Sequence, residues 1–213
     1  MPKEKIKKKM SKQQIANETE ALMELLSPTR SIDLRIQKTF EELPEKFIIL
    51  LLEKLKEYAL VNARLIKHFC DNNVPGIYVS TNKPLEVLLD SLERQNIKCK
   101  NVFFVDAITR MSGEDTVTGP NYAYVDSPKN LIDLSVAIET AATKIKSKEK
   151  FVIVDSLSTL LVYNKPGIVE KFVHSIAGKA RAWKAKGIFL MVENKQDKVI
   201  KTIAQFCDQT IEI

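Results

Sequence analysis

The chain has 213 residues, of which 45% are hydrophobic and 28% charged, values that are ordinary for a globular protein. Its formal net charge of +6 hints at nucleic acid, yet residues 1–12 alone carry +5 and leave +1 for all the others. Three cysteines without a Cys-x-x-Cys pair and only two histidines argue against a zinc site and favour reduced thiols in a cytoplasmic protein. The longest uninterrupted apolar run, Phe47 to Leu52, is far shorter than the roughly 20 residues of a membrane-spanning helix.

Residues 1–10 are predicted to form a basic, solvent-exposed tail. The lysines in or beside this tail are Lys3, Lys5, Lys7, Lys8, Lys9 and Lys12. Such a run could contact nucleic-acid phosphates or anionic lipid. No aromatic residue lies between these lysines, which argues against a surface that stacks single-stranded bases. We therefore favour a solvated chain end over a binding segment.

Two short helices are predicted between this tail and the main domain. The first runs from Ser11 to about Leu26, and Pro28 follows directly after it. The second begins at Ser31 and presents one apolar stripe, because Ile32, Ile36, Phe40 and Leu43 recur every three or four residues. Pro44 ends that helix. Residues 11–44 are thus expected to form a helical appendage packed on the domain that follows.

From residue 45 to residue 213, apolar runs alternate with helical segments. Strands are expected at Phe47–Leu52, Gly76–Thr81, Val102–Ala107, Ala123–Val125, Phe151–Val154, Gly187–Val192 and Thr210–Ile213. Helices are expected at Tyr58–Asp71, Pro84–Gln95, Ser127–Lys146, Pro166–Lys184 and Val199–Cys207. This alternation predicts an α/β three-layer sandwich whose mostly parallel sheet is covered by helices on both faces. A single helix over Pro44–Asp71 is the alternative, although Phe47-Ile48-Ile49 favours a strand.

The segment Phe151–Leu160 is the most informative stretch, because a buried-type strand runs directly into Asp155 and Ser156. Open α/β sheets bind ligands beyond the carboxyl ends of their strands. Asp106 ends an earlier strand in the same way, and Glu193 follows a later one. A capping role for Asp155 in the loop at Ser156–Ser158 or in the next helix is favoured over metal binding.

Three elements resemble the RecA superfamily, in particular its KaiC-like branch. They are the strand Gly76–Thr81, the proline-led helix that begins Pro84-Leu85-Glu86, and the strand Val152–Asp155 followed by Ser156-Leu157-Ser158. The resemblance covers residues 45–213 and implies a RecA-like sheet of the phosphate-loop NTPase type. It also implies that Asp155 and Ser156 stand where an active relative binds magnesium and nucleotide.

Two departures from this resemblance argue against catalysis. A phosphate loop needs glycines whose backbone amides wrap the phosphates, yet the first strand is followed by Glu53-Lys54-Leu55-Lys56 and the chain has no glycine before Gly76. The acidic residues that the KaiC-like branch carries after its second strand are replaced by Asn82 and Lys83. Neither side chain is a carboxylate base at neutral pH.

Three functional hypotheses follow from the sequence. The favoured one is a non-catalytic regulatory or scaffolding protein that acts through protein partners or self-association and needs no cofactor. The second is an Mg-ATP-binding protein or weak ATPase with an atypical cradle, in which Asp155 holds the metal and Lys54 or Lys56 the phosphates. In that case Asn82, Lys83, Asp106 and Glu193 would line the crevice. The third is a nucleic-acid accessory factor that uses the basic tail.

Overall fold

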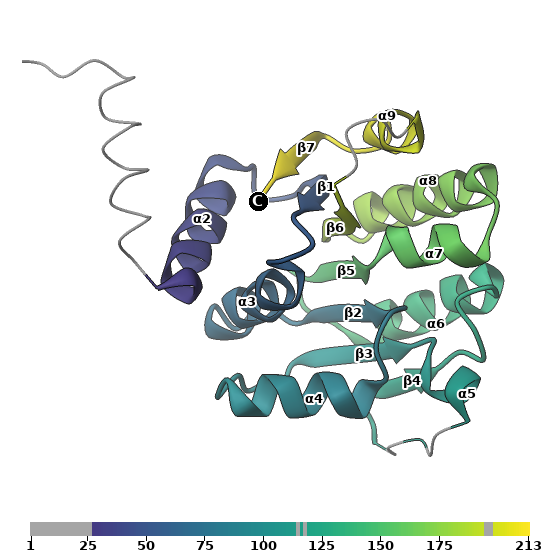
Figure 1. Ribbon diagram of the computed structural model, residues 1–213, viewed down its shortest axis with the longest axis horizontal. Helices are drawn as coiled ribbons and strands as arrows, with labels where there is room; N and C mark the ends of the chain where they lie inside the picture. Colours follow the sequence, from purple (N-terminus) through teal and green to yellow (C-terminus); the bar gives the residue numbers. More distant parts are fainter. Residues whose placement is uncertain (1–26, 114–115, 117–118, 194–197) are drawn as a thin grey trace, which may run out of the picture.

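The fold is seen in a computed structural model that describes residues 27–113, 116, 119–193 and 198–213 (Figure 1). Its sheet has seven strands in the order β4-β3-β2-β5-β6-β1-β7, and every neighbouring pair is parallel. The strands are β1 (Ile48–Glu53), β2 (Gly76–Ser80), β3 (Val102–Asp106), β4 (Tyr122–Tyr124), β5 (Phe151–Asp155), β6 (Lys186–Val192) and β7 (Gln209–Glu212). All carboxyl ends therefore meet at one edge of the sheet.

Helices cover both faces of this sheet, as the alternating pattern predicts. They are α2 (Pro28–Glu42), α3 (Tyr58–Asp71), α4 (Leu85–Arg94), α5 (Thr109–Ser112), α6 (Leu131–Lys144), α7 (Leu157–Tyr163), α8 (Pro166–Ala182) and α9 (Lys198–Ala204). Helices α2, α3 and α4 pack on one face, and α6 to α9 pack on the other (Figure 1). The three-layer sandwich of RecA-like type is confirmed, and its sheet is wholly parallel among the described strands.

Strand alternation divides the core into two hydrophobic clusters. In β1, Ile49 and Leu51 face α2, α3 and α4, whereas Ile48, Leu50 and Leu52 face α6 to α9. Successive side chains of a strand point to opposite faces, so a strand buried on both sides is apolar throughout. This burial explains why the central strands appear in the sequence as continuous apolar runs.

Most predicted elements lie where the sequence places them, with some corrections. The single helix over Pro44–Asp71 is wrong, because β1 and α3 are separate elements. The second N-terminal helix begins at Pro28, not Ser31, and the Ser27 side chain accepts a hydrogen bond from the Arg30 amide. Helix α6 begins at Leu131 after an Asn130 cap. The tail at residues 1–10 and the helix predicted over 11–26 lie outside the described residues.

Candidate functional site

Polar side chains end four strands on the same face of the sheet. In each of these strands, the residue two positions before the polar one belongs to the hydrophobic cluster that lies beneath α2, α3 and α4. Since strand side chains alternate with a period of two, the polar residues point toward that same face. These strand-end residues are Glu53 in β1, Ser80 in β2, Asp106 in β3 and Asp155 in β5. All four are buried.

Asp155 is held by two tyrosine hydroxyl groups. Tyr58, the first residue of α3, donates to its Oδ1 atom, and Tyr78, in the middle of β2, donates to its Oδ2 atom. The Asn82 amide nitrogen donates to the Tyr58 hydroxyl oxygen at 3.3 Å. Burial raises the pKa of Asp155 from 3.8 to about 8, since a low-dielectric environment disfavours the charged carboxylate. Burial therefore disfavours the ionised form of the Asp155 carboxyl group, whereas the two tyrosine hydroxyls that donate to it favour that form.

Glu53 is a second buried acid at this edge, and the sequence interpretation did not single it out. Its side chain is fully buried, and neither carboxyl oxygen has a hydrogen-bond partner among the described residues. Burial and, to a smaller extent, the charge of Asp155 raise the pKa of Glu53 from 4.5 to about 9. Burial and the charge of Glu53 likewise raise the pKa of Tyr78 well above its usual value. The signal in the sequence is the alternation along β1, which places Glu53 on the same face as Ile49 and Leu51.

The connection between β1 and α3 is a tight turn. Lys54, Leu55 and Lys56 are exposed. The amides of Glu57 and Tyr58 both donate to the Lys54 carbonyl oxygen, at 2.9 and 3.1 Å. These amides therefore have partners inside the chain.

Ser156 begins α7, and its side-chain oxygen accepts a hydrogen bond from the Thr159 amide at 3.4 Å. The expected capping role of Asp155 is thus wrong, because Ser156 caps the helix and the Asp155 carboxyl group faces the tyrosines. Thr81 joins the ends of β2 and β5, since its hydroxyl oxygen lies 3.0 Å from the Asp155 carbonyl oxygen and accepts from the Ser156 amide at 2.9 Å.

Asp106 has a different set of partners. Its carboxylate accepts hydrogen bonds from the amides of Leu85, Ile108 and Thr109 at 2.6, 2.6 and 2.9 Å. It also accepts one from the Thr109 hydroxyl at 2.6 Å. These donors lie at the starts of α4 and α5, so Asp106 satisfies amides that the helices cannot satisfy themselves.

A groove of about 230 Å³ opens at the carboxyl edge, above Tyr58. Its lining residues are Leu55, Tyr58, Asn82, Ser156, Ser158, Thr159, Val162 and Val192. Of the sequence-predicted site residues, this lining includes Asn82 and Ser156 but not Lys54, Lys56, Lys83, Asp106, Asp155 or Glu193. Pockets for drug-sized ligands usually occupy about 300–1,000 Å³, so the groove is small for a nucleotide.

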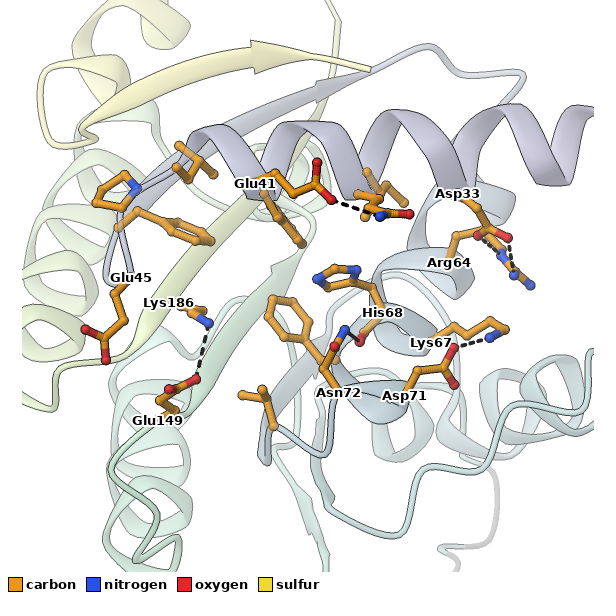
Figure 2. A pocket seen from close by; sticks show the side chains of 18 residues that line it. Asp33, Glu41, Glu45, Arg64, Lys67, His68, Asp71, Asn72, Glu149 and Lys186 are labelled. Carbon is orange, nitrogen blue, oxygen red and sulfur yellow. Dashed lines mark hydrogen bonds and ion pairs between the residues drawn. The ribbon is translucent and has the colours of Figure 1, made fainter. Parts of the chain in front are cut away.

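A larger hollow, about 720 Å³, lies at the opposite edge between α2 and α3 (Figure 2). Its rim carries three ion pairs: Arg64–Asp33 at 2.5 Å, Lys186–Glu149 at 3.4 Å, and Lys67–Asp71. The His68 and Phe40 rings meet edge to face, with 4.8 Å between their centroids, and burial lowers the pKa of His68. Open α/β folds bind ligands at the carboxyl ends of their strands, so we take the carboxyl edge of the sheet, not this hollow, as the candidate site.

Within the described residues, no helix is long and apolar enough to cross a membrane. No cluster of three or more His, Cys, Asp or Glu side chains there is arranged to hold a metal ion. Two buried acids, Glu53 and Asp155, therefore end strands that are separated by β6 at the carboxyl edge.

The seven-stranded parallel sheet with helices on both faces is a RecA-like three-layer sandwich. The structure is similar to a crystal structure of a KaiC-like protein from the hyperthermophilic archaeon Pyrococcus horikoshii OT3, with a TM-score of 0.58, 13% sequence identity, and coverage of 79% of this chain and 71% of that chain. The chain belongs to DUF7504, a family of unknown function whose sequence model matches residues 57–213. No curated protein matches the sequence.

Proposed function

We propose that this protein is a non-catalytic member of the KaiC-like fold that acts as a regulatory or scaffolding domain through protein contacts at the carboxyl edge of its sheet. The observation that carries the proposal is the state of Asp155. Its carboxyl oxygens accept hydrogen bonds from Tyr58 and Tyr78, and burial raises its pKa to about 8. Magnesium binds through ionised carboxylates, whereas both oxygens of Asp155 accept tyrosine hydroxyls and burial disfavours its charge. Asp155 therefore fits a metal–phosphate complex poorly.

Glu53 supports the same proposal through its charge and position. It ends β1 and comes directly before the turn that would have to bind phosphate. Ionisation of Glu53 would place a negative charge beside the phosphates, and its protonated form supplies only one hydrogen-bond donor. The amides of Glu57 and Tyr58 are bonded within the turn, so they do not form an amide cradle.

Exposed apolar side chains at the groove favour a protein partner over a nucleotide. Leu55 is 76% exposed and Val162 is 78% exposed, and both line the groove. Apolar side chains that share one exposed surface often mark a contact with another protein. Lys54 and Lys56 flank Leu55 and are exposed, so the partner surface is expected to combine an apolar side chain with acidic neighbours.

Nucleotide binding remains the second candidate, and one observation favours it. Ser156, Ser158 and Thr159 line the same groove next to Asp155, and hydroxyl groups can bind phosphate oxygens. In that case Mg-ATP would bind through an altered cradle that includes Lys54 or Lys56.

A thermal-shift titration with Mg-ATP decides between these two functions. A ligand at 100 times its dissociation constant stabilises a protein by about 2.7 kcal/mol. We expect no concentration-dependent rise in melting temperature up to millimolar Mg-ATP, and none with Mg-ADP. A saturable rise that is lost in Asp155→Ala would overturn the proposal and establish nucleotide binding.

A further inference from the structure

Two cysteines lie in chain segments that the sheet brings side by side. Cys70 is in the last turn of α3, before β2, and Cys99 is in the connection between α4 and β3. Strands β2 and β3 are parallel neighbours, with Gly76 opposite Val102. The Gly76 amide also donates to the Asn101 carbonyl oxygen at 3.2 Å. Because the two strands start together, the segments that lead into them converge.

The two sulfur atoms interact directly. Their side-chain interaction lowers the pKa of Cys70 and raises that of Cys99. The Cys99 thiol also donates to the Ile97 carbonyl oxygen at 3.7 Å. Lys67 also lowers the pKa of Cys70, whereas burial and Asp71 raise it. Both thiols are half-buried and pack against the edge of the same hydrophobic cluster. Each therefore retains access to a small oxidant, and Cys70 is the better nucleophile of the two.

The third cysteine provides an internal contrast. Cys207 follows α9 and packs against the hydrophobic cluster on the other face of the sheet. Burial raises the pKa of Cys207 to about 12, although Arg181 partly opposes this effect. The sheet separates Cys207 from the other two thiols, so it lacks a thiol partner within the described residues.

We propose that Cys70 and Cys99 form a modification site, in which a hydroperoxide converts the two thiols to a reversible disulfide. The Cys70 thiolate attacks one peroxide oxygen, the O–O bond breaks, and the departing oxygen takes a proton to leave as water or an alcohol. The Cys99 sulfur then attacks the Cys70 sulfenic acid, gives up its proton, and displaces hydroxide, which leaves as water. The two thiols lose two electrons and the peroxide gains them.

This disulfide would join the end of α3 to the start of β3. The closed loop contains β2 and α4, and β2 leads to Tyr78 and Thr81 at the candidate site. A cross-link stabilises a fold mainly by restricting the unfolded chain, so the oxidised protein is expected to melt at a higher temperature. The inference does not depend on the proposed function, because neither thiol belongs to the carboxyl edge.

The test treats the full-length protein with a small excess of hydrogen peroxide, alkylates the remaining thiols under denaturing conditions, and measures the intact mass. We expect the number of alkylated thiols to fall from three to one, and dithiothreitol to restore all three. Proteolysis without reduction should yield a peptide pair linked through Cys70 and Cys99. Retention of three free thiols, or a linkage that involves Cys207, would overturn the proposal.

Single substitutions provide the matched controls. Cys207→Ser should still form the disulfide, so both of its remaining thiols should disappear. Cys70→Ser and Cys99→Ser should each keep their two thiols at the same peroxide dose. If serine at either position prevents folding, Cys70→Ala or Cys99→Ala replaces it. Loss of two thiols from a Cys70 or Cys99 variant would contradict the assigned pair.

Discussion

Asp106 and Asp155 end two strands on either side of β2, and both strands are apolar runs that end in Val-Asp, Val-Phe-Phe-Val-Asp and Phe-Val-Ile-Val-Asp. Asp106 accepts four hydrogen bonds, three of them from backbone amides at the starts of two helices. Asp155 accepts two from tyrosine hydroxyls, and its charge acts on Glu53, the other buried acid at this edge. The comparison teaches that the donors around a strand-end aspartate determine its role. A set of backbone donors fixes Asp106 as a structural cap, whereas Asp155 has only two hydroxyl donors and its burial disfavours the charged carboxylate.

The largest effect should come from replacing each aspartate with asparagine. Asn retains one acceptor oxygen, so Asp106→Asn leaves buried amides without acceptors and turns a donor group toward them. We expect Asp106→Asn to lower the free energy of unfolding by about 3 kcal/mol, and Asp155→Asn to lower it by about 1 kcal/mol. Urea denaturation of both variants measures the difference. Equal losses would contradict the contrast between the two aspartates.

The second effect is the pH dependence of stability, and it tests whether buried Glu53 is protonated in the folded state. The folded-state pKa of Glu53, about 9, lies above its ordinary value of 4.5, so the folded state holds this proton more tightly than the unfolded chain. The resulting stabilisation is complete below pH 4.5 and is lost as the pH rises toward 9. One such group changes the free energy of unfolding by at most about 1.4 kcal/mol per pH unit.

Glu53→Gln removes this titration while preserving the shape of the side chain. We expect the stability of the variant to fall less steeply between pH 6 and pH 8, by about 1 kcal/mol per pH unit. Urea denaturation at both pH values provides the measurement. The exposed Glu45 supplies a matched control, and Glu45→Gln should keep the slope of the unsubstituted protein. An unchanged slope in Glu53→Gln would show that Glu53 is ionised in the folded state.

The smallest effect on stability, but the sharpest test of the proposed contact surface, comes from two exposed apolar residues. Val162 lines the groove and Ile132 lies on α6, and both are 78% exposed. Replacing either with Asp should change the free energy of unfolding by less than about 0.5 kcal/mol. Sedimentation velocity should show that Val162→Asp self-associates more weakly than the unsubstituted protein. Ile132→Asp should self-associate as the unsubstituted protein does. Identical behaviour of the two variants would remove the groove as a self-association surface.

The sequence was sufficient for the architecture because the signals for it are local. The helix over Tyr58–Asp71 was predicted with both bounds correct, and each strand lies within about two residues of its predicted bounds. The short helices α5 and α7 were missed. In α7 the hydroxyl residues Ser156, Ser158 and Thr159 resemble a loop, although Ser156 caps the helix.

The environment of Asp155 could not be predicted in the same way. Its partners, Tyr58 and Tyr78, lie 97 and 77 residues earlier in the chain, and neither belongs to a recognisable motif. Glu53 could have been found, because the alternation along β1 places it on the face of Ile49 and Leu51.

The tight turn after β1 also defines what redesign of this protein would require. Glycine substitutions at Lys54, Leu55 and Lys56 would leave the amides of Glu57 and Tyr58 bonded to the carbonyl of residue 54. A phosphate-binding variant would need a longer connection, so that several amides turn toward solvent together, and an apolar or small residue in place of Glu53. Loop length, more than glycine content, therefore separates this scaffold from a nucleotide-binding one.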